Sequence, residues 1–231
     1  MGIGDWHGFD KWFRPIAELF TPAKCTLCGK LMEDKTEDIC PQCRVEAAVF
    51  VHQPWHITHV KKWCTLWLYR GNVRSALIRF KFVRRPGYGT VFGRELGQKL
   101  KNEDIPVDVI TWVPTGFLRK RKRTYDQVEL IAREVGWQLG IPVQKLMRKT
   151  RNNRRQSGLR GKKARRKNVA GVYAPTDEAQ IAGKRILLID DIVTTGATAS
   201  ECARVLLTAG AGEILFGAVA AGGTTSSKKV Q

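Results

Sequence analysis

The chain has 231 residues, enough for one ordinary domain with a small appendage or for two small domains. Hydrophobic residues make up 43% of it and charged residues 26%, and no apolar run approaches the ~20 residues of a membrane span, so the composition is that of a globular protein. The 40 Lys and Arg outnumber the 21 Asp and Glu, and the resulting net charge of +19 favours anionic partners.

The first 24 residues are rich in aromatic side chains at near-helical spacing. They predict a short amphipathic helix that packs on the body of the protein or on a partner. Charged residues interrupt this segment, so it lacks the continuous apolar stretch of a secretory signal. We therefore expect a cytoplasmic location.

Four of the six cysteines form two C-x2-C pairs, Cys25 with Cys28 and Cys40 with Cys43, with 11 residues between the pairs. Gly29 allows the tight bend that such a knuckle requires. Disulfides are the alternative, but a chain without a secretion signal sits in a reducing compartment. We expect the four thiolates to bind one structural zinc ion in a tetrahedron. Four filled positions leave no open site for catalysis.

Three histidines follow the knuckle, at His52, His56 and His59. They could contribute to a second metal site, but their spacing matches no strong template. The neighbouring Pro54 and Trp55 favour ordinary packing, so we interpret these histidines as packed or solvated side chains.

Beyond residue 60, apolar runs of strand length alternate with helical patterns, which predicts an α/β fold with a mainly parallel sheet flanked by helices. We expect three units: residues 1–60 with the N-terminal helix and knuckle, residues 61–221 as the main domain, and residues 222–231 as a frayed tail. The predicted elements of the main domain are a strand at Trp63–Tyr69, a helix from Gly71 to about Phe80, a helix at Val91–Leu100, a strand at Val107–Val113, a helix at Tyr125–Leu139, strands at Val143–Met147, Val169–Tyr173 and Arg185–Asp190, a helix at Thr198–Ala209 and a strand at Glu213–Ala220.

Positive charge is concentrated between Arg119 and Lys167, where 18 Lys or Arg accompany three acids. Such a run can be a solvated surface that only aids solubility. Its density here favours the binding of polyphosphate, nucleic acid or both. Residues 148–168 are highly basic and almost free of apolar side chains, so we expect a mobile loop there.

The segment from Ile186 to Thr198 predicts a phosphate site. A buried strand delivers Asp190 and Asp191 to its carboxyl end, where open α/β sheets bind ligands. A turn rich in Thr and Gly follows, and then a helix begins. Backbone N–H groups at a helix start, together with threonine hydroxyls, form a nest for phosphate. Alternatively, the threonines are plain helix caps and the acids are solvated.

The two acids need a different partner, because carboxylates beside a phosphate nest repel the ligand unless they hold sugar hydroxyls or a magnesium ion. Both can accept hydrogen bonds from a ribose diol, and Mg²⁺ coordinated by the diol and a diphosphate offsets the charge. The combination suggests a ribose that carries a 5′-phosphate.

This segment resembles the phosphoribosyl pyrophosphate loop of type I phosphoribosyltransferases. Together with the cysteine pairs, further segments look like the successive blocks of the ComF (competence protein F) family across most of residues 24–220. These further segments are Gly71–Arg74, Arg79–Phe82, Val113–Pro114, Arg121–Gln127 and Gln156–Asn168.

The resemblance implies roles for individual residues, with Asp190 and Asp191 on the ribose hydroxyls and the turn at Pro114 and Thr115 facing the pyrophosphate. It implies that Mg²⁺ accompanies the ligand. Thr124, Tyr125 and Asp126 stand where the family has Gly, Phe and Asn. By the same resemblance the 5′-phosphate is bound by Thr194, Thr195, Gly196, Ala197 and Thr198. Residues implied to contact pyrophosphate or DNA are Arg121, Arg123, Gln127, Arg154, Arg155, Arg165 and Arg166, the last four in a flexible flap.

Two functions stay open. The first is a protein of DNA uptake in natural transformation that binds phosphoribosyl pyrophosphate and single-stranded DNA, with DNA-uptake proteins such as a ComF-associated helicase as partners. The second is an active phosphoribosyltransferase with an unidentified acceptor, a nucleobase or another amine. Residues Ile192–Thr198 contain no acid, histidine or lysine that could serve a nucleobase, so we assign no catalytic residue.

Overall fold

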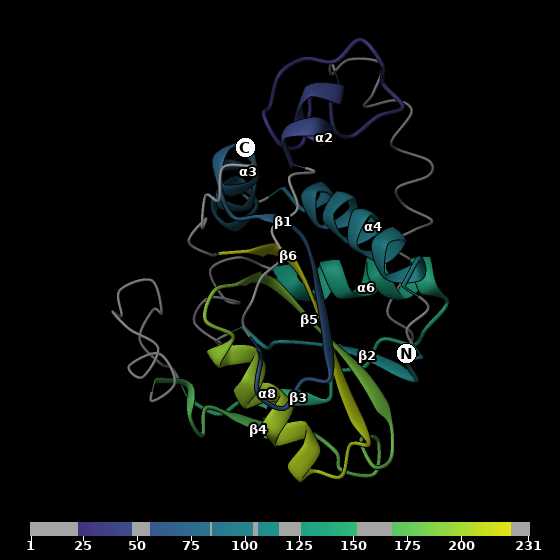
Figure 1. Cartoon of the computed structure of the whole chain (residues 1–231), viewed down its shortest axis with the longest axis vertical. Helices are drawn as coiled ribbons and strands as arrows, with labels where there is room; N and C mark the ends of the chain where they lie inside the picture. The colour runs from purple at the N-terminus through teal and green to yellow at the C-terminus, as the bar shows by residue number, and fades with distance from the viewer. Residues whose placement is uncertain are drawn as a thin grey trace, which may run out of the picture.

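The main sheet of the protein has four parallel strands in the order β1-β6-β5-β2. These are β1 (Lys62–Leu68), β6 (Glu213–Ala221), β5 (Arg185–Val193) and β2 (Val109–Trp112). A separate antiparallel pair joins β3 (Met147–Lys149) to β4 (Tyr173–Pro175). The computed structural model (Figure 1) describes residues 23–47, 56–83, 85–103, 106–115, 126–151 and 168–222.

Helices cover both faces of this sheet, as the alternation of strands and helices predicted. On one face, α4 (Gly87–Lys101) and α6 (Gln127–Leu139) pack against the strands, and α3 (Gly71–Phe82) lies beside them. On the other face lie α8 (Ala197–Thr208) and the β3–β4 pair. The short helix α2 (Pro41–Ala47) belongs to the cysteine module, residues 23–47, which contains the two cysteine pairs.

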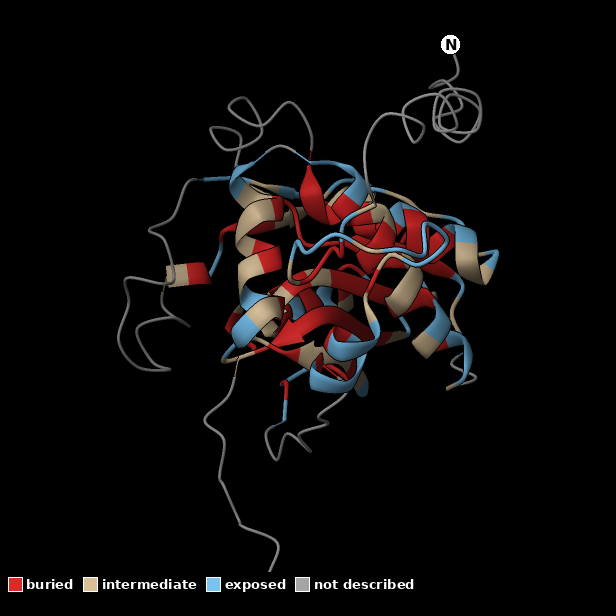
Figure 2. Cartoon of the chain, turned by 90° about the horizontal axis from the view of Figure 1, so that it is seen from above, coloured by how far each residue is buried: buried red, intermediate tan, exposed pale blue. Residues whose placement is uncertain are grey.

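The central strand β5 shows why the sequence forms a sheet that is covered on both sides. Ile186, Leu187, Leu188 and Ile189 are each no more than 1% exposed. Successive residues of a strand point to opposite faces, and these four divide accordingly between two apolar cores. A continuous apolar run is the pattern expected of a parallel strand buried on both faces. Figure 2 shows this buried interior enclosed by partly exposed helices.

Two predicted strands were wrong in position. Val143 forms only an isolated parallel bridge with Ile110, and the strand that was expected at Val143–Met147 begins at Met147. Residues 168 and 169 are helical and residues 170 and 171 form a turn, so the strand expected at Val169–Tyr173 begins at Tyr173. Leu146 and Val172 are buried as the apolar pattern predicted, but the pairing of β3 with β4 covers only three residues.

Other boundaries differ less. The helix expected from Val91 starts at Gly87, directly after Pro86, which is tolerated at a helix start. The basic stretch that was expected to be a loop from residue 148 begins instead with two residues of β3. Residues 1–22, with the expected N-terminal helix, residues 152–167 and residues 223–231 lie outside the described part of the chain.

Within the described residues, no helix is both long enough and apolar enough to span a bilayer.

Glycines allow α4 and α6 to pack closely. Gly89, Gly93 and Gly97 recur every four residues, so they lie on one face of α4. Side chains added there would meet successive residues of α6: a Cβ on Gly93 would lie 2.5 Å from the Cβ of Glu134 and 2.8 Å from the carbonyl oxygen of Ile131. The close approach holds α6, whose first turn borders the site described below.

The substitution Gly93→Ala should therefore destabilise the protein by about 1–3 kcal/mol, because overpacking forces the two helices apart. The measurement is the free energy of unfolding in a urea titration. Gly87→Ala is the matched control, since an added Cβ at the first residue of α4 has no atom within 4 Å and alanine favours helix. Equal stability of the two variants would contradict this packing.

Candidate functional site

The carboxyl end of β5 places two adjacent acids at one edge of the sheet. Asp190 lies in register with Ala218 of β6, and Asp191 is 9% exposed. The backbone N–H of Asp191 donates a hydrogen bond of 2.8 Å to Oδ1 of Asp190, so the two groups are held together. This edge is where open parallel sheets bind ligands.

A lysine from a distant helix pairs with the second acid. Nζ of Lys81, in the last turn of α3, lies 2.7 Å from Oδ2 of Asp191. Asp191 and Ile189 are two residues apart on β5, so their side chains point to the same face of the sheet. The side chain of Ile189 packs in the core on the α3 side. The sequence resemblance includes Lys81 in one of its blocks, but no pattern indicated this contact because it depends on how α3 packs.

Asp126 is a third acid near this edge, and it is 6% exposed. Its Oδ2 accepts hydrogen bonds from the hydroxyl of Thr115 at 2.8 Å and from the backbone N–H of Thr115 at 3.3 Å. Its Oδ1 accepts a bond from the N–H of Val128, which caps the start of α6. Asp126 therefore ties the end of β2 to the start of α6. Burial raises the pKa of its carboxyl group.

Burial, followed by repulsion from Asp191, raises the pKa of Asp190 to about 8. Asp126 adds to this repulsion, whereas the N–H of Asp191 and the charge of Lys81 oppose it. A half-buried carboxyl group with such a pKa holds its proton at neutral pH in the absence of a ligand. Any group that donates hydrogen bonds to it, or brings positive charge, favours the ionised form.

The turn after β5 ends at a glycine that begins the next helix. Gly196 occupies the N-cap position of α8 with φ of 70°, a conformation that favours glycine, and it has no side chain with which to cap the helix. The hydroxyl of Thr195 is buried and has no hydrogen-bond partner among the described residues. A buried, unsatisfied hydroxyl is costly, and a ligand that supplied an acceptor would remove that cost.

The other predicted site residues fall into two groups. Pro114 is buried two residues after the end of β2, next to Thr115. Gln127 is 3% exposed and donates from Nε2 to the carbonyl oxygen of Phe80. In this position its amide nitrogen joins α6 to α3. The residues outside the described part of the chain are Arg121, Arg123, Arg154, Arg155, Arg165 and Arg166.

The four paired cysteines form a second cluster, in the segment that includes α2, and α2 lies above α3 and α4 in Figure 1. The Sγ atoms of Cys25, Cys28, Cys40 and Cys43 all lie within 4.8 Å of one another, and Cys28 and Cys40 are separated by 3.9 Å. Zn–S bonds of about 2.3 Å in a tetrahedron place sulfur atoms about 3.8 Å apart. Disulfide sulfurs lie about 2.05 Å apart. The donor set and spacing therefore fit a metal such as zinc.

Backbone N–H groups favour the thiolate form of Cys25, which is the form that binds a metal ion. Burial alone would raise the pKa of Cys25, but N–H groups of Cys28, Cys40 and Leu27 outweigh it and lower the pKa to about 7. The N–H of Cys40 donates to this sulfur at 3.4 Å. Asn72 of α3 donates from Nδ2 to Sγ of Cys43 at 3.6 Å, so the main domain supports the cluster. Such supporting hydrogen bonds orient metal ligands.

The histidines that were considered for a second metal site do not join this cluster. His56 and His59 are exposed in the structure, and His52 lies outside the described residues. Among the described residues, the four cysteines make the group that could hold a metal ion.

Comparisons with known proteins agree with this arrangement. Residues 88–231 match the family model described as "Phosphoribosyl transferase domain". Competence protein F of Haemophilus influenzae is 28% identical over 109 residues, which cover 46% of this chain and 47% of that protein. The DNA utilization protein YhgH of Salmonella typhi is 23% identical over 205 residues, which cover 82% of this chain and 86% of that protein.

A solved glutamine phosphoribosylpyrophosphate amidotransferase from B. subtilis matches with 22% identity and a TM-score of 0.43, over 61% of this chain and 30% of that one. At this score the match is weak, so the assignment rests on the family model. The chain belongs to the phosphoribosyl transferase domain family. Within it, the relatives show a ComF-like protein of the phosphoribosyltransferase type, although the chain spans only about half the length of the Haemophilus relative.

The raised pKa of Asp190 gives stability a definite dependence on pH. Between the ordinary value of 3.8 and about 8, the folded protein keeps a proton that the unfolded chain loses, so the contribution of this group falls as pH rises through that window. Asp190→Asn should raise the Tm at pH 8.5 by a few degrees, at about 2–4 °C for each kcal/mol. The gain should shrink as pH falls toward 4.

The measurement is a thermal melt in buffers without phosphate or divalent cations. Asp108→Asn is the control, because its pKa is lowered to about 2, chiefly by a hydrogen bond from the Arg185 side chain. That variant should lose stability at pH 8.5 rather than gain it. A Tm gain for Asp190→Asn that is the same at pH 5 and pH 8.5 would contradict the proton assignment.

Proposed function

We propose that this protein binds phosphoribosyl pyrophosphate with Mg²⁺ at the carboxyl end of β5, and that it also binds single-stranded DNA in a process of DNA uptake. The observation that carries the first part is the junction of β5 and α8. There, Asp190 and Asp191 precede a turn in which the buried Thr195 hydroxyl has no hydrogen-bond partner among the described residues, and α8 starts at Gly196, which has no side chain.

The roles of the acids follow from their hydrogen bonds. Oδ1 of Asp190 accepts from the N–H of Asp191, and Oδ2 of Asp191 pairs with Lys81. Oδ2 of Asp190 and Oδ1 of Asp191 are thus the acceptors that the described residues leave for a ligand. Two such oxygens on neighbouring residues suit the two hydroxyls of a ribose diol. The diol donates to both, which favours ionisation of Asp190.

The phosphate role falls on the turn from Thr194 to Thr198. N–H groups at the start of a 12-residue helix carry a partial positive charge and point toward the ligand. The Thr195 hydroxyl donates to a phosphate oxygen, and Gly196 lets the phosphate approach the backbone closely. Binding therefore gives an acceptor to the Thr195 hydroxyl, which has no partner among the described residues.

The pyrophosphate lies toward Pro114 and Thr115 in this proposal, with Arg121 and Arg123 and the flap arginines around it. Guanidinium groups suit a diphosphate because they bind its oxygens bidentately. Mg²⁺ supplies charge neutralisation of the diphosphate when it is bound. The acids at the end of β5 hold the diol and orient the ribose, and we assign no general acid or base.

The DNA-uptake role is supported by the relatives and by charge. The matched proteins are named for competence and for DNA utilization. The net charge of +19, concentrated between Arg119 and Lys167, suits a phosphate backbone. We propose single-stranded DNA as the nucleic acid and a helicase of the uptake apparatus as a protein partner, in the cytoplasm.

The proposal divides the chain as the sequence suggested. Residues 1–60 serve as a zinc-stabilised accessory unit, residues 61–221 as the ligand-binding domain and residues 222–231 as a tail. The zinc ion has a structural role, because all four ligands are thiolates and leave no open position.

An active phosphoribosyltransferase is the second candidate, favoured by the description of the matched family. The two candidates share the same binding site and differ in what happens to the bound ligand. Release of diphosphate that requires one added acceptor, a nucleobase or another amine, would select the enzyme.

Calorimetry with phosphoribosyl pyrophosphate and Mg²⁺ tests the binding site. The wild type should bind, and Asp190→Asn/Asp191→Asn should reduce the affinity at least tenfold, because the diol loses both ionised acceptors. Thr195→Val should also weaken binding severalfold while leaving the Tm unchanged or higher, since it removes a buried hydroxyl without a partner.

Thr208→Val is the matched control, because Thr208 is exposed at the other end of α8. It should leave affinity unchanged. If the wild type gives no heat of binding under conditions in which it is folded, the site assignment fails.

Binding of oligo(dT), followed by fluorescence anisotropy, tests the DNA part. The slope of log K against log salt should be steep, at about −0.7 for each phosphate contact with a single strand. Arg154→Gln/Arg155→Gln should reduce the slope, whereas Arg133→Gln should not, because Arg133 already pairs with Glu129 at 2.8 Å. Binding that does not depend on salt would contradict a backbone interface.

A further inference from the structure

The last turn of α3 contacts three separate parts of the protein through three consecutive residues. Arg79 reaches the cysteine module, Phe80 reaches α6 and Lys81 reaches Asp191. In Figure 1, α3 lies between α2 of the cysteine module and the carboxyl ends of the strands. A shift of this turn would therefore change all three contacts together.

Arg79 holds the loop between the first two cysteines. Its Nη2 donates to the carbonyl oxygen of Thr26 at 3.2 Å and to that of Leu27, and its Nε donates to the hydroxyl of Tyr88 at 3.2 Å. Thr26 and Leu27 are 8% and 1% exposed. They lie between two of the cysteines, so a metal that binds both sulfurs fixes the carbonyl groups that receive the rigid guanidinium group.

Phe80 fixes the position of the last turn of α3. Its side chain is fully buried and packs edge-to-face on Phe92 of α4, with ring centroids 5.6 Å apart. Its carbonyl oxygen accepts the hydrogen bond from Gln127 at the start of α6. Because Phe80 is held by both contacts, a shift of Arg79 would also move Lys81, the residue that follows Phe80.

At the other end of the link, Lys81 and Asp191 form an ion pair of 2.7 Å in which their side chains are 25% and 12% exposed. Its geometry matters because a second carboxylate, Asp190, is adjacent and a third, Asp126, is near enough to repel it. The lysine offsets the repulsion between the acids. It also fixes which oxygen of Asp191 remains for a ligand.

We infer that Lys81 is a positioning residue for the phosphoribosyl site, and that the zinc-bound cysteine module holds Lys81 in place through Arg79. The inference rests on the proposed function of the site and extends it. It assigns the cysteine module a role in ligand binding that requires no contact between the module and the ligand. Loss of the metal would then weaken binding at the acids.

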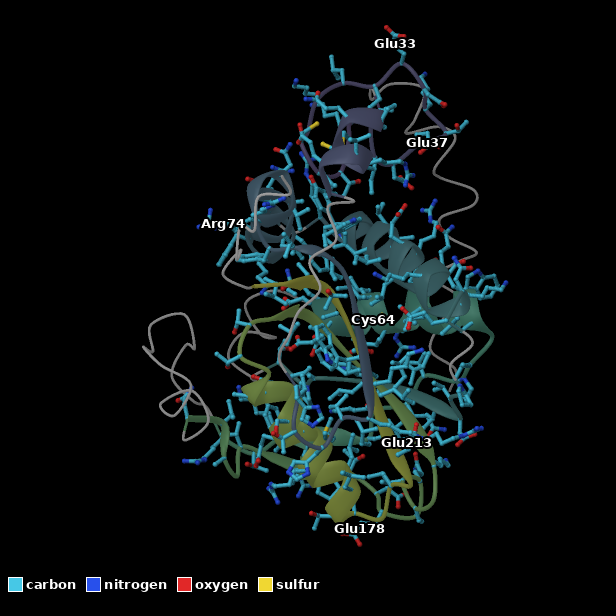
Figure 3. The ribbon with its side chains drawn as sticks, viewed as in Figure 1. Glu33, Glu37, Cys64, Arg74, Glu178 and Glu213 are labelled. Carbon is cyan, nitrogen blue, oxygen red and sulfur yellow. The ribbon has the colours of Figure 1, made fainter. Side chains whose placement is uncertain are left out.

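The test compares Lys81→Met, Lys81→Arg and Arg79→Met with the wild type in the full chain. Arg74→Met is the matched control, because Arg74 lies on the same helix and points away from the body of the protein in Figure 3. Zinc per chain is measured for each protein, followed by the affinity for phosphoribosyl pyrophosphate with Mg²⁺. Hydrogen–deuterium exchange of residues 188–198 is measured without ligand.

Lys81→Met should weaken binding at least tenfold, and Lys81→Arg should remain within about threefold of the wild type because it restores the charge. Arg79→Met, with one zinc still bound, should weaken binding to a similar extent and should speed exchange at residues 191–196. Arg74→Met should change neither. If Arg79→Met loses its zinc, Arg79→Lys takes its place in the comparison.

Equal affinity and equal exchange in wild type, Lys81→Met and zinc-loaded Arg79→Met would overturn the inference. If the wild type binds no phosphoribosyl pyrophosphate, the proposed function fails, and exchange alone decides the inference. Faster exchange at residues 191–196 in both variants, but not in Arg74→Met, then supports the link from Arg79 through Lys81, and unchanged exchange rejects it.

Discussion

The repulsion between two adjacent carboxyl groups at the end of a buried strand is the constraint around which the site is organised. In this half-buried place, burial together with repulsion from Asp191 raises the pKa of Asp190 to about 8. Two partners among the described residues are the N–H of Asp191, which bonds to Asp190, and the ammonium group of Lys81, which pairs with Asp191. In the proposed function, a ribose diol relieves this repulsion by donating hydrogen bonds to both acids.

The surrounding fold serves this arrangement at a distance. The glycines of α4 allow α6 to approach closely, and the first turn of α6 bears Asp126 and Gln127, which tie it to β2 and to α3. The cysteine module shares one apolar core with α3 and α4 and grips Arg79. The cysteine module alone is too short to build an apolar core. Metal binding supplies folding energy in such segments. The cysteine module and the carboxyl end of β5, far apart in the sequence, are thus joined through the last turn of α3.

Sequence reasoning succeeded where a local pattern carries the signal. The continuous apolar run of β5 and β6 predicts buried parallel strands, and the two C-x2-C pairs predict the cysteine cluster, because both depend on residues close in the chain. Sequence reasoning did not predict the contacts that depend on how the helices pack on the sheet. The contact of Lys81 with Asp191, and of Gln127 with Phe80, depends on how α3 and α6 lie on the sheet, and nothing in the spacing of either residue indicates it. In the sequence, Asp126 stands out only as a departure from a family pattern. In the structure, its buried carboxyl group joins the end of β2 to α6. The short strands β3 and β4 were misplaced because three-residue pairings leave little pattern.

The most direct test of the central claim is a titration of the aspartate carboxyl carbons by NMR, with Asp190→Asn used for assignment. In the ligand-free protein, the account predicts one aspartate that titrates near pH 8, and a shift of that midpoint to well below 7 when phosphoribosyl pyrophosphate and Mg²⁺ saturate the site. If Asp190 titrates near its ordinary value of 3.8 in the ligand-free protein, or if its titration does not respond to the ligand, the account is contradicted.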